Sequence, residues 1–448
     1  MHERVPDLVS GSIMRNLWKL ALPMMVGNVL QTMFGIVDMI FVGRLGPEAI
    51  AAVSLSGSVL FVIMAATTGV SVGTTAMVSR AIGAGDRLKA DRVAAQSVML
   101  GIIVSGVLAV LGMLSSRRIL MLIGARGETL VLAQSYLNIM FLGIVTVILL
   151  FLVMGIMQGA GDAKTPMKII ALSNVLNMGL DPVLIFGLLG VPALGVEGAA
   201  LATVLSRGVF LLVGLYILVS GMTYVGIRLD GLRIELSIMR KIVEIGIPAS
   251  VNLIIRSSAG VLFITIVAMY GTVAIATYGV GMRIDSVVLM PVFGLASASS
   301  TLVGQNLGAR QPERAEATAM SAAKICALIL CGVGALFYVV APQIISVFTT
   351  SPEVIAMGTE YVRVVVFSYV FMAYGMVLAM SLNGAGDTTP PLVSTAISLI
   401  VFQVPLALLL PRVVGVKGLW VSIVVAAMVQ SVIMLYVFKR GRWKQKHI

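Results

Sequence analysis

The sequence predicts an all-α polytopic membrane protein, with twelve transmembrane helices arranged as two pseudo-two-fold-related six-helix lobes. Of its 448 residues, 59% are hydrophobic and only 11% are charged, whereas a soluble chain carries about a quarter charged residues. So few charges cannot cover a surface that faces water, so a lipid-facing surface is required. Long apolar runs and an internal repeat, described next, complete the prediction.

A transmembrane helix needs about 20 mainly apolar residues. Stretches of that length, separated by polar, glycine or proline residues, occur twelve times along the chain. We expect spans at about 17–42, 49–77, 93–114, 134–157, 166–188, 196–219, 241–268, 274–303, 318–341, 357–382, 391–410 and 416–438.

The lysine and arginine residues between these spans predict the orientation of the chain. If the chain crosses the membrane twelve times, twenty of these Lys and Arg residues lie on the side that holds both termini, and six lie on the other side. Cytoplasmic loops are rich in Lys and Arg, so both termini are expected in the cytoplasm. The net charge of +12 then reports orientation, and no nucleic-acid partner is expected.

A shift of 225 residues superimposes the two halves of the sequence without a gap from Pro23 to Pro166. The strongest match is Gln158-Gly-Ala-Gly-Asp162 with Asn383-Gly-Ala-Gly-Asp387. Six helices per repeat is an even number, so both halves enter the membrane in the same orientation, with the pseudo-two-fold axis along the membrane normal. We therefore predict an N-terminal lobe over 1–220, a cytoplasmic linker over 221–240 and a C-terminal lobe over 241–448. Such lobes suit alternating access.

Polar side chains inside the first and fifth spans are the leading site candidates, because ionisable residues in a membrane are costly and usually functional. At 100° per residue, those of the first span lie within an arc of about 80°. They are Asn28, Gln31 and Asp38 in the first span and Asn174, Asn177 and Asp181 in the fifth.

We expect Asp38 and Asp181 to face one pocket in the N-terminal lobe. Burial and like charge favour the protonated form of at least one carboxyl group, and carboxylate and amide oxygens also suit Na⁺. The alternative is that both carboxylates are solvated near helix ends. At the 225-residue offset the counterparts of Asp38, Asn177 and Asp181 are Phe263, Phe402 and Leu406, so ion chemistry is expected in the N-terminal lobe.

The C-terminal half has its own intramembrane charges, Arg256, Arg283 and Asp285. Arg256 and Asp285 either form a structural ion pair or take part in gating or substrate binding. Tyr278 is a candidate aromatic residue of the substrate cleft.

Pro23 and Pro248 each remove a backbone hydrogen bond early in a helix. Each is expected either to kink its helix permanently or to act as a hinge.

Several site types are missing from the sequence. The two histidines, His2 and His447, are terminal, which excludes a histidine-based metal site or proton relay inside the membrane. No GxxxxGK[ST] nucleotide-binding loop occurs. We expect no cofactor, no catalytic residue and no metal beyond Na⁺. Any energy that the protein needs must then come from an ion gradient, with H⁺ or Na⁺ as the coupling ion.

Taken together, the motifs resemble the multidrug and toxic compound extrusion (MATE) family over essentially the whole chain. They are Leu22-Pro23-Met24-Met25, Val37-Asp38, Val42-Gly43-Arg44-Leu45-Gly46, Gly83-Ala84-Gly85-Asp86, the paired GAGD loops and Val303-Gly304-Gln305-Asn306-Leu307-Gly308. The resemblance implies two six-helix lobes and export of mostly cationic, amphipathic compounds, driven by H⁺ or Na⁺ entry.

Within the family, Asp38, Asn177 and Asp181 resemble the DinF-like branch, and this match adds Thr203 to the pocket. The NorM branch carries acidic residues in helices 7 and 10. Here the seventh predicted span, 241–268, has Arg256, and Glu360 lies only at the start of the tenth, 357–382.

These implications lead to one function and two alternatives. The resemblance implies a cation-coupled drug antiporter in a prokaryotic cell (inner) membrane, with small-molecule drugs and lipid as partners and a monomeric state. A lipid-linked saccharide flippase is the first alternative. An intramembrane aspartyl protease using Asp38 and Asp181 is the second, although its catalytic context is absent.

Overall fold

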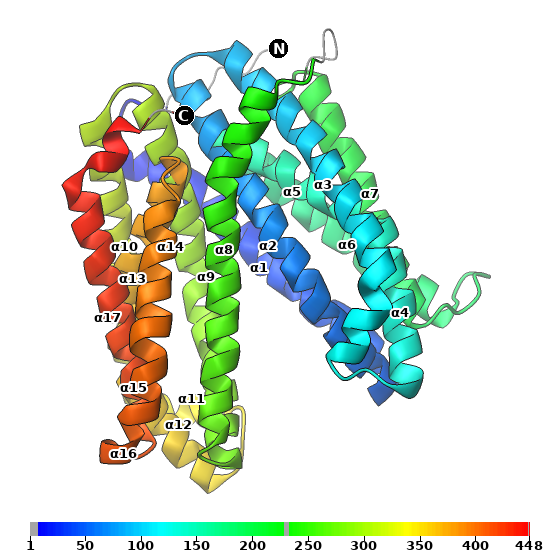
Figure 1. Ribbon diagram of the computed structural model, residues 1–448, viewed down its shortest axis with the longest axis vertical. Helices are drawn as coiled ribbons and strands as arrows, with labels where there is room; N and C mark the ends of the chain where they lie inside the picture. The colour runs from blue at the N-terminus through cyan, green and yellow to red at the C-terminus, as the bar shows by residue number, and fades with distance from the viewer. Residues whose placement is uncertain (1–7, 228–232, 447) are drawn as a thin grey trace. The chain divides into compact units, whose positions relative to one another are not determined.

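The computed structural model describes residues 8–227, 233–446 and 448, and within them the chain is helical throughout, without strands. Residues 228–232 of the predicted linker, Arg228 among them, and the two terminal histidines lie outside the described residues. Contacts divide the chain into two compact units, shown with their helices in Figure 1. Unit 1 includes Val26–Ile247, and unit 2 comprises Leu8–Met25 and Pro248–Ile448.

The helices that begin in the first half of the chain form most of unit 1. In this unit α2 packs against α3, α4 and α5, and α7 packs against α4, α5 and α6. Their bounds are α1 Ile13–Gly43, α2 Pro47–Gly83, α3 Arg87–Leu122, α4 Gly127–Leu142, α5 Ile144–Gly159, α6 Lys164–Phe186 and α7 Val196–Val219.

In unit 2, α13 packs against α9, α10 and α17, and these helices run side by side in Figure 1. The bounds are α8 Leu236–Ala268, α9 Thr272–Gly308, α10 Pro312–Val339, α11 Ala341–Ser346, α12 Pro352–Val365, α13 Ser368–Gly384, α14 Thr389–Ala396, the π-helix η1 Ile397–Gln403, α15 Val404–Leu409, α16 Pro411–Val414, α17 Lys417–Arg440 and the 3₁₀ helix η2 Arg442–Gln445.

The prediction of twelve spans is confirmed in number, although two spans are broken. Among the described residues ten helical stretches are long and apolar enough to cross a membrane, and two bent pairs supply two more spans. The pair α4–α5 bends by 52° at Gly143, and the pair α12–α13 bends by 53°. Hydropathy cannot detect such bends, because the chain stays apolar through them.

The beginnings of α1 and α8 belong to the opposite unit from the rest of their repeats. Both helices continue through their prolines, and the boundary between the units falls within three residues of Pro23 and next to Pro248. In unit 2, a Cβ at Gly294 would clash with Met25. In unit 1, a Cβ at Gly246 would come within 2.7 Å of the Gly69 carbonyl oxygen. Gly69 and Gly294 are repeat counterparts, so the same glycine position receives a helix in each unit.

The repeated GAGD loop has a packing reason. Its first glycine, Gly159 in unit 1, lies so close to α2 that an added Cβ would be 2.9 Å from the Thr75 carbonyl oxygen, and its counterpart Gly384 meets the Ser300 carbonyl of α9 in the same way. Thr75 and Ser300 are themselves 225 residues apart. The second glycine of each loop, Gly161 or Gly386, has a positive φ that disfavours other residues.

The substitution Gly384→Ala should destabilise the protein by about 1–3 kcal/mol, because the new Cβ would overlap a backbone carbonyl that cannot move independently. The measurement is the thermal unfolding midpoint of the purified protein in detergent. Gly332→Ala in α10 is the matched control, since its Cβ would meet open space. Equal midpoints for the two variants would contradict this packing argument.

Candidate functional site

The candidate site lies in unit 1, where α1 and α6 carry the predicted polar residues. On α1, Asn28, Gln31 and Asp38 are half-buried. The Oδ1 atom of Asp38 is buried and has no hydrogen-bond partner. A carboxylate oxygen in this condition is costly in a membrane protein, because no lipid group can satisfy it.

On α6, Asn177 and Asp181 are spaced four residues apart and therefore share a helix face. They are 1% and 0% exposed. The Asn177 Nδ2 atom donates a hydrogen bond of 3.3 Å to Asp181 Oδ1, while Asn177 Oδ1 and Asp181 Oδ2 have no partner. Both oxygen acceptors are thus buried and available to a cation or a proton.

The two helices are tied together beside this face. Asn174, one turn before Asn177, donates from Nδ2 to the Leu30 carbonyl oxygen of α1 over 2.8 Å. Asp38 and Asp181 lie close enough for their charges to influence each other, so the structure brings the two predicted carboxylates into one electrostatic environment. Neither is a fully solvated group at a helix end.

Sequence reasoning missed Arg207 of α7, although it lies in this environment. Its guanidinium interacts electrostatically with Asp38 and lies 5.2 Å from the centre of the Phe34 ring, a cation–π contact. Its Nε atom is buried without a hydrogen-bond partner. Thr203 is 5% exposed and lies one turn before Arg207, on the same face of α7. A signal was present in the sequence, since Arg207 is the single basic residue in the span 196–219.

Tyr136 of α4 also belongs to this group. It is 6% exposed and lies near the charged groups of Asp38, Arg207 and Asp181. Its repeat counterpart is Tyr361, which identified it as a repeated position but not as a site residue. The described residues hold no group of three or more His, Cys, Asp or Glu side chains that could bind a metal ion. Two carboxylates and one amide form a smaller set of ligands, and their oxygens suit a proton or a Na⁺ ion.

Unit 2 contains a different polar centre around Asp285 of α9. Asp285 accepts hydrogen bonds from the hydroxyls of Tyr361 and Tyr369, at 2.6 and 2.8 Å. Arg256 and Arg283 are exposed, and among the described residues no ion pair joins Arg256 to Asp285. The ion-pair alternative for Arg256 is therefore not seen in this structure.

Aromatic rings surround this centre. Tyr278 is buried, and its ring centre lies 5.2 Å from that of Phe263 and 6.4 Å from that of Trp420. Tyr361 packs edge-on against Trp420 at 5.0 Å. Phe263 is the counterpart of Asp38, so the position that holds a carboxylate in unit 1 holds an aromatic core residue in unit 2.

The internal repeat at an offset of 225 residues coincides with the two segments matched by a family model. The MatE model matches residues 23–183 and 248–409, so its two matched segments begin at Pro23 and Pro248. The chain belongs to the MatE family of transporters. It is therefore a multi-pass membrane transporter and not an enzyme, as the sequence predicted.

Several known proteins are similar to this chain over nearly its whole length. The "Probable multidrug resistance protein NorM" of Thermotoga maritima is 30% identical, over 100% of this chain and 95% of the relative. A protein named FAD transporter from Shewanella oneidensis is 29% identical, over 97% and 96%. A solved structure described as the outward-facing conformation of a multidrug resistance MATE family transporter has a TM-score of 0.91 at 30% identity and covers 100% of both chains.

Replacing Tyr361 by Phe should destabilise this MatE protein by about 1–3 kcal/mol, since Asp285 Oδ2 would lose the donor that stabilises it away from water. The expected result is a lower thermal unfolding midpoint in detergent. Tyr436→Phe is the control, because that tyrosine of α17 is 65% exposed. If the Tyr361→Phe and Tyr436→Phe variants have the same thermal unfolding midpoint, the hydrogen bond to Asp285 contributes no stability.

Proposed function

We propose that the chain is a cation-coupled multidrug antiporter that exports amphipathic, mostly cationic compounds by alternating access. One observation carries the proposal. Three buried oxygens without partners, on Asp38, Asn177 and Asp181, lie on two neighbouring helices of unit 1. Such oxygens are stabilised when a proton or Na⁺ binds. The names of the relatives, several of them multidrug export proteins, support the substrate class.

Coupling follows from charge. With Asp38 and Asp181 ionised and Arg207 positive, the three side chains carry a net charge of −1. Binding of one proton or one Na⁺ makes the group neutral, and its attraction for a cationic drug falls. By linkage, a bound drug weakens cation binding by the same factor. Cation entry thus releases the drug, and Thr203 and Tyr136 border the site at which this happens.

The internal repeat supports a proposal for which parts of the protein move. We propose the lobes 1–220 and 241–448, joined by 221–240, as the moving halves, with both termini in the cytoplasm of a prokaryotic cell and the protein acting as a monomer. Pro23 and Pro248 are proposed as hinges, since they lie near the boundaries between the two units. The polar residues Asn28, Gln31 and Asn174, together with Arg256, Arg283, Asp285 and Tyr278, are proposed for substrate binding or gating. We also propose that the chain belongs to the DinF-like branch, because Asp38, Asn177 and Asp181 resemble the ion site of that branch.

The substitution Asp38→Asn should abolish dye efflux from proteoliposomes, because an amide can neither take up the proton nor neutralise Na⁺. Transport is measured with a pH gradient and a Na⁺ gradient imposed separately, which identifies the coupling ion. The control is Asp86→Asn, the same chemical change at the N-cap of α3, where Asp86 accepts from the Lys89 N–H over 2.9 Å and asparagine caps equally well. Full efflux by a correctly folded Asp38→Asn protein would refute the proposed coupling.

Arg207→Gln should strengthen the binding of a monovalent cationic dye about tenfold, because removing a positive charge from this low-dielectric site makes the site more negative. The measurement is equilibrium fluorescence anisotropy of the dye on purified protein. Arg207→Lys preserves the charge and should bind dye as the unsubstituted protein does. An unchanged or weaker affinity in Arg207→Gln would show that Arg207 does not influence the bound cation.

A further inference from the structure

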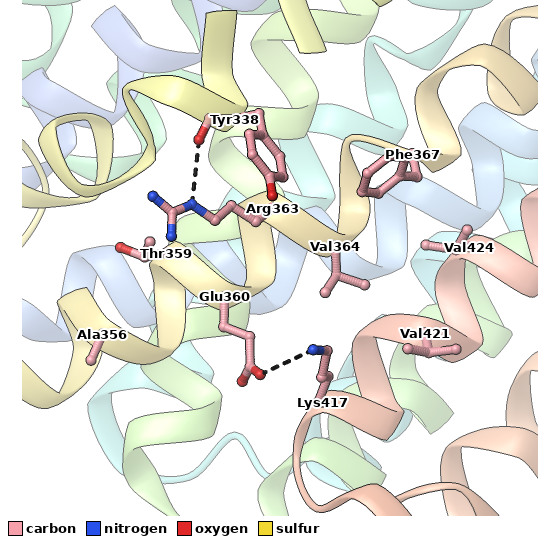
Figure 2. Close-up of a pocket in the computed structure, with 10 residues that line it drawn as sticks. All are labelled: Tyr338, Ala356, Thr359, Glu360, Arg363, Val364, Phe367, Lys417, Val421 and Val424. Atoms are coloured by element: carbon pink, nitrogen blue, oxygen red, sulfur yellow. Dashed lines mark hydrogen bonds and ion pairs between the residues drawn. The ribbon is translucent and has the colours of Figure 1, made fainter. Parts of the chain in front are cut away.

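A second site-like feature lies in unit 2, lined by none of the residues that form the Asp285 centre. It is a cavity of about 610 Å³ formed by α10, α12, α17 and the short segment between α12 and α13, shown in Figure 2. It is lined by Tyr338, Ala356, Thr359, Glu360, Arg363, Val364, Phe367, Lys417, Val421 and Val424.

The lining follows from helical periodicity. On α17, Lys417, Val421 and Val424 are four and three residues apart, so they share one face. On α12, Glu360 and Arg363 are three residues apart and face them. The charged Lys417 is the first residue of α17, and Val424 lies about 10 Å further along the helix axis. The cavity therefore has a charged end at a helix terminus and an apolar wall that extends into the span.

Lys417 and Glu360 interact only weakly with each other. Lys417 Nζ is 3.9 Å from Glu360 Oε1, and the two side chains are 53% and 42% exposed. This distance exceeds the about 2.7–2.9 Å of a strong charge-assisted hydrogen bond. Each group therefore has donors or acceptors to spare.

Arg363 is held in place without using its full donor set. Its Nε donates to the Tyr338 carbonyl oxygen over 3.4 Å, and its guanidinium lies 5.6 Å from the centre of the Tyr338 ring. The same ring packs edge-on against Phe367 at 6.2 Å. Among the described residues, no ion pair engages Arg363. The terminal nitrogens of a guanidinium are well suited to a phosphate, which they can bind with two hydrogen bonds.

We propose that this cavity binds the head group of a zwitterionic phospholipid with a primary ammonium group. The phosphate would lie between Arg363 and Lys417, the ammonium would donate to Glu360, and an acyl chain would follow Val421 and Val424. Charge complementarity favours this occupant. Two cations and one anion match a phosphate and an ammonium, whereas a purely anionic lipid would meet the Glu360 carboxylate. The exposed aromatic pair Tyr338 and Phe367 is typical of the membrane interface.

The test uses the purified full-length protein and counts retained lipid by native mass spectrometry, with dioleoyl phosphatidylethanolamine, phosphatidylglycerol and phosphatidylcholine as probes. Phosphatidylethanolamine should be retained in preference to the other two. Arg363→Gln and Lys417→Gln should each weaken its binding about tenfold. Glu360→Gln should shift the preference towards phosphatidylglycerol, because the repulsion of an anionic head group is removed.

The controls separate this site from general lipid binding. Arg240→Gln is the matched variant, since Arg240 is an exposed arginine paired with Glu244 on α8, and it should retain lipid normally. Soluble phosphoethanolamine and inorganic phosphate test whether the head group alone suffices. Equal retention by Arg363→Gln and the unsubstituted protein overturns the proposal, and so does full competition by inorganic phosphate. Variants are first compared for their thermal midpoint without added lipid, which excludes misfolding.

Discussion

The organisation of this protein depends on the cost of an unsatisfied polar group inside a bilayer. Backbone groups avoid the cost by forming helices, and the buried carboxylate of unit 2, Asp285, avoids it by accepting from two tyrosine hydroxyls. The two carboxyl groups of the candidate site in unit 1 do not avoid it. Oxygens of Asp38, Asn177 and Asp181 are left buried without a partner. In the proposed mechanism a proton or a cation binds these oxygens, so energy is coupled to transport at the place where polar groups are left unsatisfied.

The two repeats share a backbone plan but differ in their polar chemistry. Glycines at equivalent positions, Gly159 and Gly384, allow the same close helix contact in each unit. The tyrosines Tyr136 and Tyr361 are equivalent, but Tyr136 lies near carboxylates of α1 and α6, whereas Tyr361 donates a hydrogen bond to a carboxylate of α9. Duplication thus preserved the packing surfaces, while the charged residues diverged. In the proposed mechanism, the coupling ion binds in only one of the two repeats because of this divergence.

Arg207 changes the electrostatics expected from two carboxylates alone. A site with charge −2 would retain a monovalent cation strongly in every state, whereas a fixed guanidinium brings the site close to neutrality once a single cation has bound. Stacking on Phe34 stabilises the guanidinium without consuming a carboxylate. In the proposed mechanism, release of substrate then requires only one bound proton or Na⁺. The basic side chains of the unit 2 cavity lie outside this balance and face a different class of ligand.

The sequence by itself determined the twelve spans and the parallel duplication, and it named Asp38, Asn177 and Asp181 as site candidates, because hydropathy, repeat offset and helical spacing can be read along the chain. The tertiary structure alone decided the rest. At the bend between α4 and α5, Gly143 lies so close to Val204 of α7 that an added Cβ would clash with it, and the exchange of the beginnings of α1 and α8 depends on contacts between segments far apart in the chain. Arg207 is recognisable in the sequence as an intramembrane charge, but its proximity to Asp38 requires that α7 pack beside α1 and α6. Asp285 likewise acquires its partners Tyr361 and Tyr369 from helices more than seventy residues away, and no pattern along a single helix encodes that encounter.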